Sequence, residues 1–203
     1  MISMKEKLWV IGQRRLAKMR PTAEGIRGWQ AYLMDYQPIA EYPDDTYVWL
    51  ACILALESVE TGNFGVGCIL VNDDGNVVVQ EHNQVFNPHF RSDRHAEMVV
   101  MDNFEDANPQ LTNLEGYTLY TSLEPCPMCL VRLSTCNISK VLFAAADVEG
   151  GMVHRLNNLP PFWLELAQRE TFGRARCAQD LVNVATQIFF LNLDTLIAKV
   201  KAR

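Results

Sequence analysis

The chain has 203 residues, of which 49% are hydrophobic and 21% charged, proportions that are ordinary for a globular protein and allow one large domain. Its formal net charge of −6 disfavours an extended phosphate-binding surface, because nonspecific nucleic-acid affinity comes largely from Lys and Arg. No run of about 18 apolar residues is present, so we expect no membrane span.

The first 20 residues lack the uninterrupted apolar run and the small-residue cleavage site of a signal peptide. Six cysteines in such a chain favour free thiols or metal ligands over disulfides, and we expect a cytoplasmic protein. Four cysteines have apolar neighbours and are predicted to be buried small hydrophobic side chains: Cys52, Cys68, Cys136 and Cys177.

Two amphipathic helices are predicted first, over residues 8–19 and 24–36. We interpret them as a packing extension, with a lid or dimer element near the site as the alternative. The chain is accordingly divided into an N-terminal helical extension, residues 1–45, and a domain of residues 46–203.

A helix over residues 46–60, capped by Asp45 or Thr46, opens that domain. Two strands follow at 65–71 and 76–81, and the Asp74-Gly75 pair between them predicts an antiparallel hairpin. After a loop at 84–93, Asp93 is predicted to cap a helix over 94–104.

The second half of the domain is predicted as strand 116–121, helix 127–136 and strand 139–145, joined by a right-handed crossover. A loop at 147–161, a short helix at 162–168, a strand near 170–176 and one apolar helix over 178–199 complete the chain. These elements predict an α/β protein, with a mixed sheet of about five strands and helices on both faces.

The residues that carry chemistry are His95, Cys126 and Cys129. A Cys-x-x-Cys pair by itself also occurs in redox-active dithiols and structural zinc sites. A closed structural zinc site needs four protein ligands, and the sequence offers no second Cys pair and no other histidine with matching spacing. Three ligands leave one tetrahedral position open, which is typical of a catalytic zinc.

The wider motifs are His95-Ala96-Glu97, Pro125-Cys126-Pro127-Met128-Cys129, the run Asn63-Phe64-Gly65-Val66-Gly67, and Asn83 after a strand. In these motifs, over about residues 46–177, the chain resembles the cytidine deaminase superfamily. It is most similar to the branch that holds guanine deaminases, fungal-type cytosine deaminases and tRNA adenosine deaminases. The resemblance implies a three-layer sandwich fold.

It also implies a Zn²⁺ cofactor, held by the His and the two Cys, and hydrolytic release of ammonia from a nucleobase, nucleoside or related amino-heterocycle. Glu97 would move protons between the attacking water and the base. The residues expected to border the base are Asn83, Ala96, Ser122 and Asp147. Asn83 is alternatively a turn residue, and Asp147 an ordinary loop acid.

Guanine or cytosine is the first-choice substrate, since residues 148–152 lack the basic side chains expected of a tRNA-binding rim. A tRNA adenosine deaminase is the alternative, and a zinc-stabilised binding protein without turnover is the alternative from another class. Apolar helices at both ends of the chain lead us to expect a homodimer whose added helices narrow the entrance to the pocket.

Overall fold

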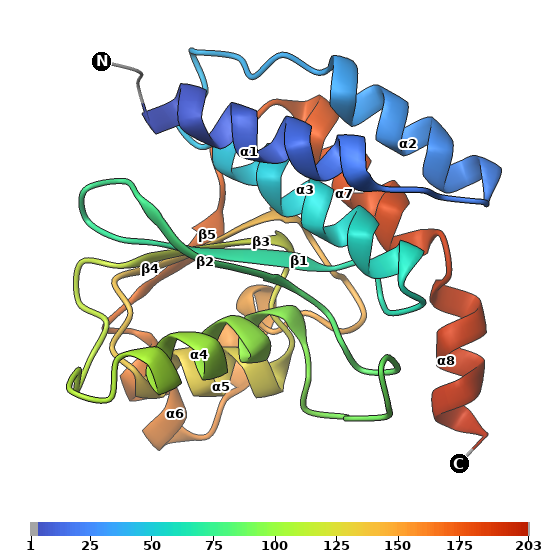
Figure 1. Ribbon diagram of the computed structural model, residues 1–203. Coiled ribbons are helices and arrows are strands. Elements are labelled where there is room, and N and C mark those ends of the chain that lie inside the picture. The colour runs from blue at the N-terminus through green and yellow to red at the C-terminus, as the bar shows by residue number, and fades with distance from the viewer. Residues whose placement is uncertain (1–3, 203) are drawn as a thin grey trace.

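The computed structural model describes residues 4–202 as helical layers on both faces of one sheet (Figure 1). The helices are α1 (Met4–Lys18), α2 (Glu24–Asp35), α3 (Asp45–Glu60), α4 (Ala96–Ala107), α5 (Pro127–Thr135), α6 (Pro161–Ala167), α7 (Gln179–Phe190) and α8 (Leu193–Lys201), with a 3-10 helix at Val153–Asn158. The strands are β1 (Gly67–Val71), β2 (Val77–His82), β3 (Thr118–Leu123), β4 (Lys140–Ala145) and β5 (Thr171–Arg174).

The sheet has the order β2-β1-β3-β4-β5. Strand β1 pairs antiparallel with β2 and β3, whereas β3, β4 and β5 run parallel. Helices α3 and α7 cover one face and α4 and α5 the other (Figure 1). The predicted α/β sandwich with a mixed five-stranded sheet is confirmed.

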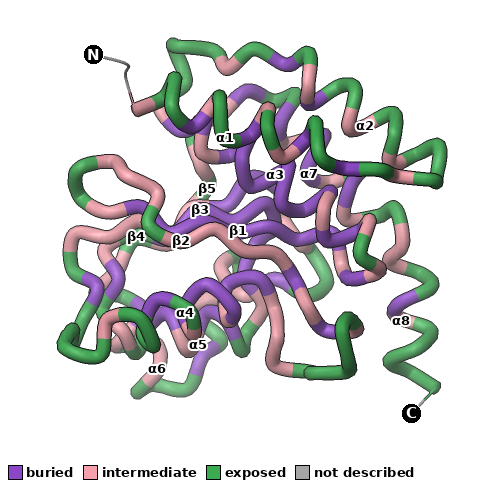
Figure 2. The backbone as a smooth tube through the Cα atoms, in the orientation of Figure 1, coloured by how far each residue is buried: buried purple, intermediate pink, exposed green. Residues whose placement is uncertain are grey.

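Helix α3 is buried on nearly every side, because it lies between the sheet and the added helices α1 and α2 (Figure 2). Its Trp49 stacks on Trp9 of α1 with ring centroids 4.6 Å apart, and its indole N–H donates to the Leu33 carbonyl of α2 at 2.9 Å. A Cβ on Gly12 would lie 2.3 Å from the Trp49 ring, so this glycine permits the close approach of α1. The N-terminal helices therefore share the core of the domain.

The carboxylate of Asp45 joins three segments and is fully buried. It accepts hydrogen bonds from the Tyr36 hydroxyl at 2.7 Å, the Ile39 N–H at 2.8 Å and the Ala178 N–H at 2.7 Å. The expectation that Asp45 or Thr46 caps the helix is wrong: Asp44 is the N-cap residue and makes no side-chain capping bond. Asp45 instead fixes the segment after α2 and the start of α7 against α3.

Replacing Asp45 by Ala is expected to lower the free energy of unfolding by roughly 2–4 kcal/mol, because three donors, two of them in buried hydrogen bonds, lose their acceptor. Chemical denaturation monitored by circular dichroism measures this change. The matched control is Asp35→Ala, which removes an exposed carboxylate at the end of α2 and should change stability by no more than about 0.5 kcal/mol. Equal stability of the two variants would contradict this role for Asp45.

Two other predictions about the helices are wrong. The single helix expected over residues 178–199 is divided at Leu191 and Asn192 into α7 and α8, which meet at a bend of 43°. Asp93 does not cap α4: the N-cap residue is His95, and the Asp93 carboxylate pairs with Arg91 at 2.6 Å.

Within residues 4–202, no single helix is long and apolar enough to cross a membrane, and only α7 and α8 counted together reach that length and composition. All six cysteines are free. Cys52 and Cys68 are buried as predicted, while Cys136 and Cys177 are half-buried.

Candidate active site and metal centre

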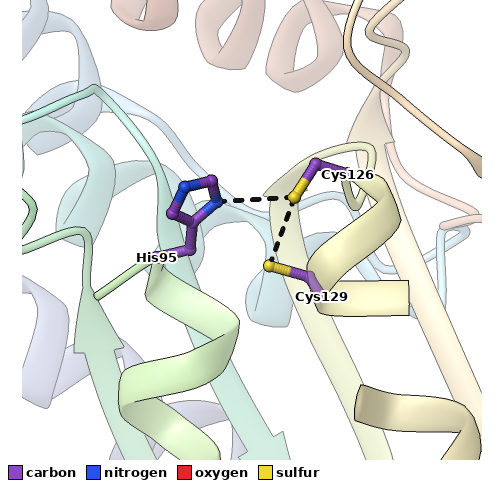
Figure 3. Close-up of side chains that lie close together, drawn as sticks. All are labelled: His95, Cys126 and Cys129. Atoms are coloured by element: carbon purple, nitrogen blue, oxygen red, sulfur yellow. Dashed lines mark hydrogen bonds between the residues drawn. The ribbon is translucent and has the colours of Figure 1, made fainter. Parts of the chain in front are cut away.

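Two helix starts bring His95 together with Cys126 and Cys129 (Figure 3). His95 is the N-cap residue of α4, and Cys126 is the N-cap residue of α5. The Nδ1 atom of His95 lies 3.5 Å from the Cys126 sulfur, which lies 3.6 Å from the Cys129 sulfur. The positive ends of two helix dipoles therefore meet where the thiols are, and this favours thiolates.

These separations fit a tetrahedral zinc ion. With Zn–S bonds of about 2.3 Å and Zn–N bonds of about 2.0–2.1 Å, tetrahedral ligands lie about 3.8 Å apart for two sulfurs and about 3.6 Å apart for sulfur and nitrogen. The three donor atoms all lie within 4.8 Å of one another, and it is Nδ1 of the imidazole that faces the thiols. The three side chains thus offer an open, three-ligand donor set.

The pKa values of the three side chains in this cluster shift in different directions. Its hydrogen bond with Cys129, together with the His95 imidazole, lowers the pKa of the Cys126 thiol to about 4 despite its burial. The hydrogen bond to Cys126 and burial raise the pKa of Cys129. Burial by itself lowers the pKa of His95, but its contact with the Cys126 thiolate outweighs burial and the net shift is upward.

Glu97 lies beside the thiols on the first turn of α4 and is 4% exposed. Its Oε1 accepts a hydrogen bond from the Thr121 hydroxyl at 3.1 Å, and its Oε2 lies 3.5 Å from the Cys129 sulfur, which donates to it. Burial, and then the Cys126 charge, raise the pKa of this carboxyl. A carboxyl held in place with a raised pKa is suited to both accepting and returning a proton.

The cluster opens into a cavity of about 210 Å³. The polar lining comes from His95, Glu97 and Cys126 at the cluster, and from Asn83, Glu124 and Asp147 around it. The apolar lining is Phe64, Val66, Leu123, Phe189, Leu193 and Ile197. The cavity is smaller than the roughly 300–1,000 Å³ of pockets for drug-sized ligands and suits one heterocyclic base.

Two of the four predicted base-contacting residues line this cavity. Asn83 is buried and its Oδ1 accepts from the Val85 N–H at 3.1 Å. Asp147 Oδ1 accepts from two N–H groups of its own loop, at 2.9 Å from Gly150 and 3.2 Å from Glu149. The expected role of all four residues toward a base remains a prediction.

The other two predicted residues are buried beside the cavity. Ala96 is the first residue of α4, and Ser122 accepts from the Gly67 N–H at 3.1 Å within the sheet.

Sequence reasoning missed the wall contributed by the C-terminal helices. Phe189 of α7 and Leu193 and Ile197 of α8 line the cavity, whereas α1 and α2 contribute nothing to its described lining. Within one chain the N-terminal helices do not line the described cavity, and the expected homodimer whose added helices narrow the entrance stays a prediction. Asn192, which separates α7 from α8, donates from Nδ2 to the Asn63 carbonyl at 2.7 Å and so fixes α8 beside the cavity.

Glu124 is a second missed residue. Its buried carboxylate accepts from the Asp147 N–H at 3.1 Å, and from the N–H and the ring Nδ1 of His154, both at 2.8 Å. These bonds hold the loop after β4 against the site.

Residues 42–145 match the family model for the cytidine and deoxycytidylate deaminase zinc-binding region. This range contains the His-x-Glu motif, the Cys pair and β1 to β4. The chain belongs to the cytidine deaminase superfamily. It is a zinc-dependent hydrolase that deaminates by breaking a C–N bond.

Curated relatives in this superfamily include several tRNA-specific adenosine deaminases. The chain is 38% identical over 118 residues to the Bacillus subtilis enzyme, covering 57% of this chain and 70% of that protein. It is 37% identical over 108 residues to the Aquifex aeolicus enzyme, covering 52% and 68%. A probable cytosine deaminase of Schizosaccharomyces pombe is 26% identical over 133 residues, covering 65% and 78%.

Solved structures agree with the superfamily fold. A structure from a study of A-to-I editing by tRNA:A34 deaminases has a TM-score of 0.56 and 25% identity, covering 68% of this chain and 95% of that chain. The guanine deaminase of Nitrosomonas europaea has a TM-score of 0.57 at 15% identity, covering 76% and 89%, and at that identity it supports the fold alone.

Proposed function

We propose that this deaminase acts on adenosine within an RNA, with tRNA as the substrate class. The reaction would convert adenosine and water to inosine and ammonia. The observation that carries this proposal is the match, at 38% identity over 118 residues, to a tRNA-specific adenosine deaminase. It replaces guanine or cytosine, the first choice from sequence, as the preferred substrate.

In this reaction His95, Cys126 and Cys129 would hold the zinc ion. Zinc bound there would supply a Lewis acid that ionises water near neutral pH. Glu97 would take one proton from the attacking water and deliver it to the ring nitrogen, and would then take the second proton of that water and deliver it to the departing amine, which leaves as ammonia. Its contacts with Thr121 and Cys129 keep the carboxylate in place for these transfers.

The remaining cavity would position the base. Because the Asn83 side-chain oxygen is held by Val85, the amide NH₂ is the group available to donate to an acceptor on the ring edge. The apolar lining from Leu123, Phe189 and Leu193 would pack against the ring and exclude water from the reacting carbon. A cavity for one base requires a polynucleotide substrate to present its target unstacked.

The net charge of −6 restricts how such a substrate is bound. Phosphate neutralisation by Lys and Arg gives affinity that depends strongly on salt, and an acidic protein can supply only a small part of it. We therefore expect RNA binding to depend on contacts near the cavity.

Zinc-loaded enzyme is expected to form inosine in a tRNA anticodon stem-loop with a kcat/KM at least about 100-fold above that for free adenosine, since the bases flanking the target add binding contacts. Nuclease digestion and chromatography measure inosine. Ammonia release measures turnover of adenosine, guanine and cytosine. A matched stem-loop with the target adenosine replaced by guanosine is the control. Faster turnover of free guanine or cytosine than of the stem-loop would overturn the proposal.

We also propose a homodimer, with residues 1–45 as an addition to a deaminase domain of residues 46–203. Much of the apolar surface behind the dimer prediction is covered within the chain, since Trp9 stacks on Trp49 and Leu33 is buried. Phe190, 59% exposed on α7, remains available for a partner subunit. The mass of the protein in solution tests the homodimer directly.

A further inference from the structure

Three phenylalanines form a row from the cavity to the surface, and we call them the aromatic row: Phe64, Phe86 and Phe90. Phe64 lines the cavity. Its ring centroid lies 5.7 Å from that of Phe86, which in turn lies 6.0 Å from that of Phe90. Phe90 is 48% exposed. The row therefore connects the wall of the base pocket with aromatic surface outside it.

The loop that carries Phe86 and Phe90 is closed by hydrogen bonds on both sides. At its start the Gln84 N–H donates to the Arg94 carbonyl at 2.9 Å, and the Arg91 N–H donates to the Val85 carbonyl at 2.8 Å. The Asn63 side chain accepts from the Phe86 N–H at 2.7 Å. These bonds hold an aromatic side chain toward solvent on a fixed backbone.

A positive charge lies over the middle of the row. Figure 1 shows α8 beside the loop between β2 and α4, and Lys199 of α8 lies with its Nζ 5.6 Å from the Phe86 ring centroid. Lys199 is exposed, so its ammonium can reach a phosphate while its stem stays on the ring. One α-helix thus lines the pocket through Leu193 and Ile197 and places a cation over the Phe86 ring.

We propose that the aromatic row and Lys199 form a stacking subsite for the nucleotides next to the target base. This inference rests on the proposed function, an RNA substrate. When the target enters the pocket, its neighbours lose their stacking partner and stay outside the pocket, and the half-exposed Phe90 ring offers them an aromatic surface. Stacking on an aromatic side chain contributes about 1–3 kcal/mol per base. It requires no basic surface, which agrees with the net charge of −6.

The test is the affinity of zinc-loaded protein for a short labelled single-stranded RNA, measured by fluorescence anisotropy. Its target adenosine is replaced by purine riboside, which has no amine to release. Phe90→Ala is expected to weaken binding about tenfold, and Phe90→Trp to restore it to within about twofold, since Trp also offers an aromatic face. Phe162→Ala, which removes a 62% exposed ring on α6, is the matched control and should bind as wild type does.

Free purine riboside, measured as a competitor, separates the subsite from the pocket. The nucleoside has no neighbours to stack, so Phe90→Ala should weaken RNA binding more than nucleoside binding. Equal RNA affinity of Phe90→Ala and wild type, an equal loss in Phe90→Trp, or no RNA binding by wild type would overturn the subsite.

The two proposals fail differently. If Phe90→Ala deaminates RNA as fast as wild type does, the subsite proposal is wrong and the proposed function stands. If RNA binding depends on Phe90 but the enzyme deaminates only free bases, the proposed function is wrong and the subsite proposal stands.

Discussion

Glu97→Gln is expected to lower kcat by roughly 10²–10⁴-fold while zinc content and folding stay unchanged. Gln has the shape of Glu and its oxygen can accept from Thr121 as Glu97 does, at 3.1 Å. Its NH₂ can donate to a Cys129 thiolate, so the packing of the buried site is kept. The amide cannot carry a proton between water and base, and the loss should therefore appear in turnover.

Single-turnover kinetics measure the chemical step, elemental analysis measures the zinc content, and thermal unfolding measures the stability of the fold. Glu105→Gln is the matched control, because Glu105 lies on the same helix, is exposed, and pairs with Arg132 away from the cavity. It should retain wild-type turnover. Activity of Glu97→Gln within a few-fold of wild type would contradict the proton-transfer role.

Cys126→Ser and Cys129→Ser are each expected to reduce bound zinc from one ion per chain to near zero after dialysis against a chelator, and to abolish turnover. A serine hydroxyl is not ionised near neutral pH, and zinc prefers thiolate. Loss of the ion should also lower the melting temperature, because a ligand that binds only the folded state stabilises it.

Cys136→Ser is the control for these variants. Its sulfur donates to the Leu133 carbonyl at 2.9 Å, a bond that a serine hydroxyl can also make, and it is not part of the three-residue metal cluster. Zinc content is measured with a colorimetric chelator on denatured protein. Full zinc retention in both Cys126→Ser and Cys129→Ser would contradict their assignment as ligands.

Local spacing, together with the resemblance to the cytidine deaminase superfamily, made the metal cluster predictable. His95 and Glu97 belong to one short motif, as do Cys126 and Cys129, and each pair lies at a helix start where the sequence itself fixes the geometry. The hairpin was predictable from its Asp74-Gly75 turn, and the parallel pairing of β3 with β4 from the strand-helix-strand order.

The cavity wall was not predictable from such spacing. Residues 178–199 contain neither Gly nor Pro, so their apolar pattern predicted one straight helix. The break depends on Asn192, whose side chain bonds to Asn63 far away in the sequence. Only after that bend do Leu193 and Ile197 line the cavity. An Asn followed two residues later by Asp194 was the available signal of a new helix start.

The helical pattern of α3 was interpreted correctly as a helix, and the packing of α1 and α2 against it agrees with their interpretation as a packing extension. Apolar residues on nearly all sides of a helix indicate burial from several directions. In α3 this burial comes from the sheet, from α7, and from α1 and α2 together, with Trp49 between Trp9 and Leu33.

The order of these parts along the chain separates two events during synthesis. A growing chain contains every candidate zinc donor once Cys129 is made, but Ile197, part of the cavity wall, comes close to the last described residue. The nascent protein thus acquires the means to capture metal well before it can enclose a base. Zinc insertion can precede catalytic competence, and we expect the newborn enzyme to stay inactive until α8 has docked.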